Sequence, residues 1–317
     1  MRNKRTVLYL ILIVLSVAAI SAGTFLDLSI SEKLYIGDCL PAKIISFLTV
    51  FLFISSCFFF LGVLFRQLWE RYCKVSGRII TGVVFIYLFC STAALGGAKI
   101  LFDPLFEGRA EALQGTLTGS LITGSVFFSA FFLLGALANG KRNDPEGIKT
   151  LIKLIAVFTF GFLLAHYLNC MIDRPSYARL ISEGGITDYK PWYEIPKGSR
   201  LLMSLTDLIS SQPGSFVSSH ALYAVLFIVI FPSYSLAFPA LEKHRNLLMV
   251  TAGIISVAVI ICRMISGDNY LTDISFAALY SLKFCLTFDG FKIRPGKKRG
   301  IDSLKVVYSK GKSRSGH

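Results

Sequence analysis

Apolar residues along this chain are gathered into eight long runs, separated by shorter polar connections. The runs cover residues 7–23, 43–65, 79–98, 119–139, 152–172, 219–240, 247–266 and 273–288, and the last is the shortest. A helix needs about 20 apolar residues to cross a bilayer. Lipid offers the backbone no hydrogen-bond partners, so runs of this length form helices. The pattern predicts an all-α fold, a polytopic membrane helical bundle of about eight transmembrane helices.

Composition and charge placement extend this prediction. The chain has 317 residues, of which 54% are hydrophobic and 16% charged, whereas a soluble domain carries about 25% charged residues. Lys and Arg gather in alternate connections, at 2–5, 66–78, 141–153, 243–245 and from 292 onward, and the connections near 24–42, 99–118 and 173–218 are mixed or acidic. By the positive-inside rule both termini face the cytoplasm. We therefore predict a multi-pass protein of the cell membrane.

The net charge of +14 does not indicate a nucleic-acid partner, because the basic residues form no groove-reading element. The basic tail is better explained as a topology anchor or as an attraction to anionic lipid. The first run resembles a signal peptide, but Ala19-Ile-Ser-Ala22 is a weak cleavage site and a retained anchor helix is predicted. Seven scattered cysteines without CxxC or Cys/His spacing indicate no metal site, and no cofactor is expected.

Three polar segments interrupt the second half of the chain. They are Tyr167–Pro175, which closes the fifth run, Ser215–His220, which opens the sixth, and Arg263–Asp273, which bridges the seventh and eighth. The predicted topology puts all three on the outer side of the membrane. Their residue types suit a phosphate ester: arginine offers a fork of donors, a serine-rich turn entering a helix offers N–H groups, and histidine can protonate a leaving oxygen.

In order and spacing these segments resemble the motifs of the type 2 phosphatidic acid phosphatase superfamily, membrane lipid phosphatases related to vanadium haloperoxidases. The family pattern is Lys-x6-Arg-Pro, then Pro-Ser-Gly-His, then Ser-Arg-x5-His-x3-Asp. This chain has Tyr167 and Arg174-Pro175 in the first motif, Val217-Ser-Ser-His220 in the second, and Cys262-Arg263, Asn269 and Asp273 in the third. The Trp192-Tyr193 pair and the flanking Gly267 and Tyr270 also resemble bacterial members. The resemblance covers roughly residues 80–290.

The resemblance implies a two-step mechanism in which the third-motif histidine attacks phosphorus and its aspartate orients the ring. Carried over by position, Arg174 and Arg263 would bind phosphate, and Ser218 and Ser219 would lie in the phosphate cradle. His220 would be the general acid.

Asn269 stands where the nucleophile belongs, and a carboxamide nitrogen is neither basic nor nucleophilic. Asp273 then has no imidazole to orient and at most accepts a hydrogen bond from the amide. Tyr167 also removes a cation from the first motif. His166 is a possible substitute nucleophile, but neighbours on a helix diverge by about 100° and we expect it to face elsewhere.

Each retained residue also has a structural explanation. Arg174 and Arg263 lie at helix ends, where arginines snorkel toward water. His220 can be a structural residue at a helix start. Asp273 can cap the last helix by accepting from the following turn, a role compatible with a remnant site.

We predict three parts: a two-helix membrane segment at 1–75, a lipid-phosphatase-like transmembrane core of six helices at 76–290, and a basic cytoplasmic tail at 291–317. The expected role is recognition of a phosphorylated lipid head group, an isoprenoid (di)phosphate or a phosphatidate-type phospholipid, at the extracytoplasmic face. Phosphatase activity would be impaired or absent, as in a pseudoenzyme. The alternative is an active, divergent phosphatase or phosphotransferase on the same lipids.

Overall fold

The computed structural model describes residues 2–37, 39–72, 74–103, 116–138, 145–172, 174–183, 185–194 and 214–290. Its helices are α1 (Arg2–Leu34), α2 (Leu40–Arg71), α3 (Val75–Leu101), α4 (Leu117–Leu137), α5 (Pro145–Ile172), α6 (Tyr177–Ser182), η2 (Ile186–Asp188), α8 (Ser219–Ser233), η3 (Tyr234–Leu236), η4 (Pro239–His244), α9 (Arg245–Ile265) and α10 (Leu271–Gly290). Eight stretches within them are long and apolar enough to span a membrane. Each coincides with one of the predicted runs, which confirms the all-α polytopic bundle.

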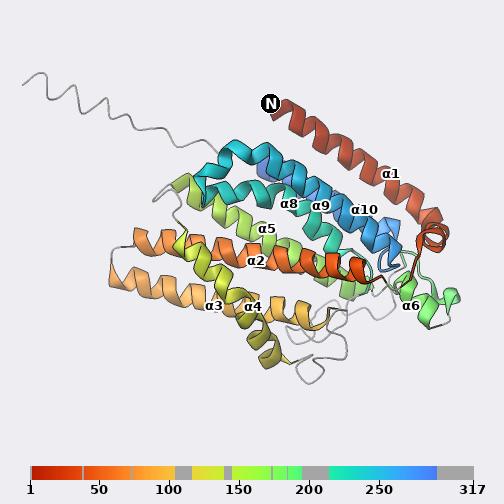
Figure 1. Ribbon diagram of the computed structural model, residues 1–317, viewed down its shortest axis with the longest axis horizontal. Coiled ribbons are helices and arrows are strands. Elements are labelled where there is room, and N and C mark those ends of the chain that lie inside the picture. Colours follow the sequence, from red (N-terminus) through yellow and green to blue (C-terminus); the bar gives the residue numbers. More distant parts are fainter. Residues whose placement is uncertain are drawn as a thin grey trace, which may run out of the picture.

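The spanning helices lie roughly alongside one another in an elongated bundle (Figure 1). We call one end the site end: there α1, α3, α5 and α9 finish, and α2, α4, α8 and α10 begin. It lies toward the right in Figure 1, beside α6. All three polar segments identified in the sequence belong to this end. The predicted tail at 291–317 and most of the loop before α8 lie outside the described residues.

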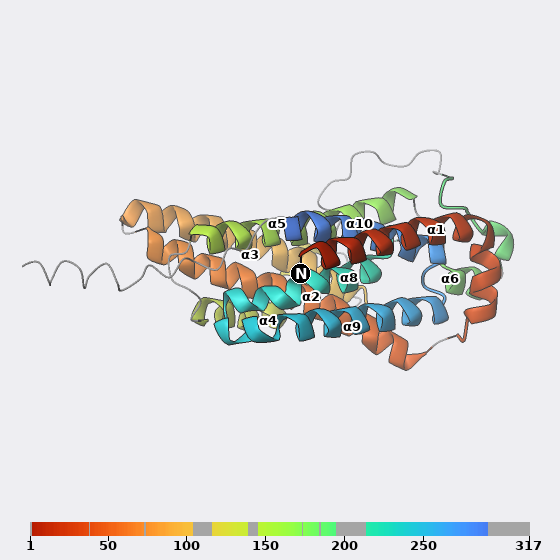
Figure 2. The same cartoon turned by 90° about the horizontal axis from the view of Figure 1, so that it is seen from above.

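The first helix is longer than its apolar run. The sequence predicts a loop from about residue 24, whereas α1 continues to Leu34. Its last turns carry Asp27 and Ser31, both buried. Their side chains are surrounded by protein and not by lipid, where a polar group without a hydrogen-bond partner would be costly. α1 lies along α10 (Figure 2), and the backbone of Ile36 donates to the carbonyl of Ile265 at 2.9 Å. The predicted two-helix N-terminal segment therefore packs directly against the last helices of the chain.

Glycines allow α2, α3 and α4 to approach one another closely. A Cβ atom built on Gly124 would lie 2.0 Å from the carbonyl oxygen of Ala93, and one on Gly97 would lie 1.8 Å from that of Ser120. In lipid, helices associate through close van der Waals packing, and small residues at the contact make that possible. The α3–α4 contact places the end of α3 at the site end of the bundle.

Gly124→Ala is expected to lower the free energy of unfolding by about 1–3 kcal/mol, because the added methyl group meets backbone that cannot turn away. The matched control is Gly253→Ala on α9, where no atom lies within 4 Å of the added group. Thermal unfolding of both variants in the same detergent measures the difference. Equal melting temperatures would contradict the close α3–α4 approach.

Candidate functional site

The three polar segments meet at the site end and are joined by hydrogen bonds. The first two are linked where Ser215 N–H donates to the carbonyl of Arg174 at 2.8 Å. The second and third are linked where Ser218 N–H donates to the carbonyl of Asp273 at 3.3 Å. The first and third are linked where Arg174 Nη1 donates to Asp273 Oδ1 at 2.6 Å. Segments separated by up to a hundred residues thus form one interlocked unit.

Asn269, in the third segment, connects that segment to the second by hydrogen bonds of its side chain. The side chain is buried, and its Oδ1 accepts from Arg263 Nε at 2.8 Å and from Ser218 Oγ at 3.0 Å. Its Nδ2 donates to the carbonyl of Ser215 at 2.6 Å. The amide donates to Ser215 and not to Asp273, so the hydrogen bond that the sequence allowed between Asn269 and Asp273 is not made. A carboxamide suits this position because it accepts on one side and donates on the other.

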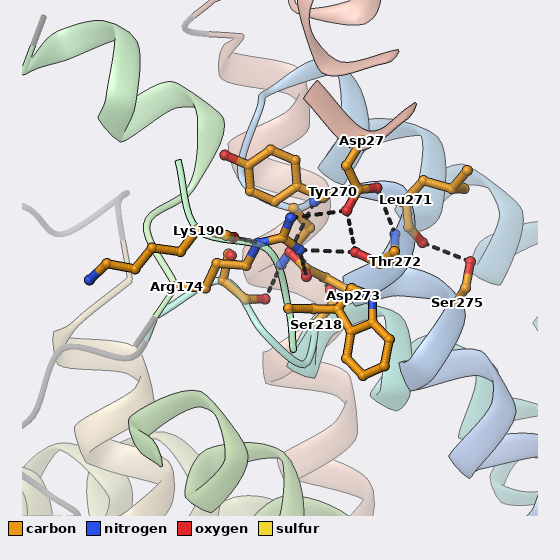
Figure 3. Close-up of polar contacts among 12 residues, drawn as sticks. Asp27, Arg174, Lys190, Ser218, Tyr270, Leu271, Thr272, Asp273 and Ser275 are labelled. Carbon is orange, nitrogen blue, oxygen red and sulfur yellow. Dashed lines mark hydrogen bonds and ion pairs between the residues drawn. The ribbon is translucent and has the colours of Figure 1, made fainter. Parts of the chain in front are cut away.

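Arg174 is fully buried at the centre of the unit, and all its N–H donors go to protein acceptors. Nε donates to the carbonyl of Lys190 at 2.8 Å. Nη1 donates to Thr272 Oγ1 and Asp273 Oδ1, and Nη2 to Asp27 Oδ2 at 3.0 Å and to the hydroxyl of Tyr189 at 2.9 Å. Figure 3 shows the guanidinium pointing into this ring of oxygen atoms. In this arrangement no Arg174 donor remains for a phosphate.

Asp27, from α1, takes the place at Arg174 that an external anion would need. Its Oδ1 accepts from the backbone N–H of Thr272 at 3.0 Å, and its Oδ2 from the Thr272 hydroxyl (Figure 3). Thr272 is the second residue of α10, so the carboxylate lies at the positive end of that helix. An arginine fork and a helix N-terminus make an anion site, and the chain fills it with its own side chain.

Asp273 holds the start of α10 in a different way from the predicted cap. It is the third residue of the helix, and its Oδ2 accepts from the N–H of Tyr270, the residue before the helix, at 3.0 Å. The carboxylate therefore reaches back toward the N-cap, as in a capping box, and does not accept from the following turn. Its other oxygen binds Arg174.

The positive charge of Arg174 is stabilised by its neighbours although the side chain is buried. Burial alone would lower the pKa of the guanidinium, but the carboxylates of Asp273 and Asp27 outweigh burial and raise that pKa above its usual value. The rings of Tyr270 and Tyr189 add cation–π contacts, with centroids 4.0 Å and 5.2 Å from the guanidinium carbon. Arg174 stays charged wherever the protein is folded.

Arg263 and His220 keep unused polar groups. Arg263 Nη1 pairs with Asp268 at 2.8 Å and donates to Ser46 Oγ on α2 at 3.4 Å. Its Nη2 has no hydrogen-bond partner among the described residues. His220 is the second residue of α8, is partly buried, and has no hydrogen-bond partner in the described part of the chain. Ser218, two residues before His220, donates to the same Asn269 oxygen that accepts from Arg263 Nε, which connects the start of α8 to Arg263.

The remaining predicted residues are Ser218, Ser219 and Tyr167. Ser218 is the N-cap of α8: its Oγ accepts from the N–H of Ala221 at 3.3 Å while donating to Asn269. Ser219, which begins α8, is also buried. The Ser218 hydroxyl is thus engaged within the fold. Tyr167 lies on α5 and is partly buried.

Sequence reasoning missed Asp27, because it assigned the residue to a loop. The available signal was an acidic residue next to an apolar run of membrane-spanning length, where carboxylates are costly and need a partner. It also missed Trp192 as a tether: the indole Nε1 donates to Thr24 Oγ1 on α1 at 3.0 Å, and the ring packs on Phe216 and Phe276.

Among the described residues, no three His, Cys, Asp or Glu side chains are grouped so as to hold a metal ion. Comparison of the chain with protein-family models, curated proteins and solved structures finds no match.

Proposed function

We propose that this membrane protein binds the phosphate group of a phosphorylated lipid at the site end of the bundle and releases little or no phosphate from it. Arg263 and His220 are the binding groups, and they lie on helices that the three interlocked segments hold in place. The predicted orientation puts this end at the outer leaflet. An isoprenoid phosphate and a phosphatidate share the chemistry that these groups recognise, a phosphate ester at a membrane surface.

The observation that carries the proposal is the set of hydrogen bonds made by Asn269. At the position where the resemblance implies a nucleophile, the buried amide connects Arg263, Ser218 and Ser215. Arg263 is oriented by this amide, so the substitution supports positioning of a phosphate-binding arginine. Arg174, which the resemblance assigns to phosphate, supports the framework instead, through Asp27 and Asp273.

The proposal is tested with purified protein in detergent and a short-chain phosphatidate. We expect saturable binding, a loss of about tenfold in affinity in Arg263→Gln, as expected for one charge-assisted contact, and no phosphate release above a heat-inactivated sample. Arg179→Gln is the matched control, since Arg179 is exposed in α6 and pairs with Glu183 on the surface. Equal binding of phosphatidate and of phosphatidylcholine with the same chains would overturn the proposal.

A second candidate function, slow hydrolysis of the same lipids, is favoured by His220, which has no hydrogen-bond partner among the described residues and so retains a ring nitrogen for a leaving oxygen. Water would then be the attacking group. Phosphate release by the parent protein that disappears in His220→Ala would establish this candidate in place of pure binding.

A further inference from the structure

The carboxylate of Asp27 accepts hydrogen bonds from groups that would also bind a phosphate. Arg174 Nη2 donates to Oδ2 at 3.0 Å, and the backbone N–H of Thr272 donates to Oδ1 at 3.0 Å. The Thr272 hydroxyl donates to Oδ2 as well (Figure 3). A guanidinium fork beside a helix N-terminus and a hydroxyl offers the donors that phosphate oxygens accept from. Asp27 therefore occupies a place whose chemistry fits an oxyanion.

This place is connected to the proposed phosphate-binding arginine through two residues. The Asn269 amide accepts from Arg263 Nε at 2.8 Å and donates to the carbonyl of Ser215 at 2.6 Å. Ser215 N–H in turn donates to the carbonyl of Arg174 at 2.8 Å. One framework of hydrogen bonds therefore holds both arginines at the site end.

The links that join the three polar segments do not depend on Asp27. Ser215 N–H binds the Arg174 carbonyl, Ser218 N–H binds the Asp273 carbonyl, and Arg174 Nη1 binds Asp273 Oδ1. None of these three bonds involves α1. The segments and their arginine can therefore stay in place when the Asp27 carboxylate leaves and another anion takes its position.

A smaller part of α1 is buried than of the central helices. In an apolar window of 18 residues, 17% are buried in α1, compared with 67% in α2 and 67% in the span that begins with α8. Near Asp27 the helix is attached by a single neutral hydrogen bond from Trp192 Nε1 to Thr24 Oγ1, at 3.0 Å. A movement of the outer end of α1 therefore exposes fewer buried side chains than a movement of α2 or α8.

A released Asp27 carboxylate would reach water. Asp27 follows the apolar run at 7–23, and the predicted topology puts this end of α1 at the outer membrane surface. Glu32, in the last turn of the same helix, is already exposed. An oxyanion that takes the place of the carboxylate keeps Arg174 paired, and the costly state, a buried arginine short of its partner, is avoided.

We propose that Asp27 is an internal competitor of the ligand. A lipid phosphate that enters the site end exchanges with the Asp27 carboxylate at Arg174 and Thr272, and the exchange releases the outer end of α1. The inference rests on the proposed function and gives α1 an autoinhibitory role in it: Arg174 belongs to the framework while Asp27 is bound and contacts the phosphate once Asp27 has left. Free inorganic phosphate presents the same group without the lipid.

The affinity test compares Asp27→Asn with Glu32→Gln. Asparagine keeps the size of the side chain and removes the competing charge. Binding of dioctanoyl phosphatidate in detergent is expected to tighten about tenfold, because an occupant present in about nine tenths of the molecules lowers an apparent affinity by that factor. Glu32 is an exposed carboxylate on the same helix, and Glu32→Gln should bind as the parent does. Inorganic phosphate is titrated in parallel, and an equal gain for it would identify the free anion as sufficient.

A second measurement uses the unaltered protein and decides alone if Asp27→Asn does not fold. Amide hydrogen exchange at residues 24–34, read by mass spectrometry, is expected to rise with phosphatidate and not with phosphatidylcholine of the same chains, since released turns lose protection. Equal affinity of the parent and Asp27→Asn, with unchanged exchange at 24–34, would overturn this inference and keep the proposed function. Absence of phosphatidate binding in both proteins would overturn the proposed function itself.

Discussion

Arg174→Met is expected to lower the free energy of unfolding by about 3–5 kcal/mol, the usual cost of removing one partner from a buried ion pair. Methionine fills much of the volume but leaves two buried carboxylates, Asp27 and Asp273, without their cation. It also leaves the carbonyl of Lys190 without a donor. The loss should appear as a lower melting temperature and poorer recovery of monodisperse protein in detergent.

The matched control is Arg179→Met, five residues further along the chain in α6. Arg179 pairs with Glu183 on the surface, and an exposed pair of this kind contributes about 0–1 kcal/mol. Asp27→Asn, which removes only one of the two carboxylate charges at Arg174, should fall between the two. Similar melting temperatures for Arg174→Met and Arg179→Met would show that the buried ion cluster does not hold the segments together.

Asn269→His is expected to fold and to release phosphate from a lipid phosphate above the parent's background. A neutral imidazole has one donor and one acceptor, so it can still donate to Ser215 and accept from either Ser218 or Arg263. The leucine side chain in Asn269→Leu has neither a donor nor an acceptor. This variant should unfold at lower temperature, because the three hydrogen bonds of the Asn269 side chain are lost. Melting temperature and phosphate release are measured on both variants.

The expected gain in Asn269→His is on the order of tenfold over background, far below the roughly 10⁴–10⁶-fold that a nucleophile contributes within an intact site. The limit arises because Arg174 remains bound to Asp27 and Asp273 and Tyr167 supplies no charge. The gain should disappear in the double variant Asn269→His/His220→Ala. Phosphate release in Asn269→His no higher than in Asn269→Leu would contradict the positional match with the lipid phosphatases.

The helices and the meeting of the three segments were predictable from the sequence for a simple reason. Bilayer thickness imposes a length on every apolar run, so the eight spans and their alternation follow from counting residues. Alternation puts the ends of the fifth and seventh runs beside the starts of the sixth and eighth. Arg174, Ser218 and Asn269 were therefore expected at one end, where the structure has them.

The partners of those residues were not predictable in the same way. Arg174 binds Asp27 across 147 positions, and no local periodicity relates them. Arg174 lies at a helix end before a proline. The sequence at this position does not tell whether its donors bind protein acceptors or a phosphate.

The pairing of Asp27 with Arg174 also sets an order for assembly in the membrane. The first helix is synthesised well before its partner, so during synthesis it carries a carboxylate that has no cation. The backbone N–H and hydroxyl of Thr272, which complete its set of donors, are made later still. The donors to Asp27 are therefore complete only when α10 has been inserted, so α1 and α10 take up their final contact together.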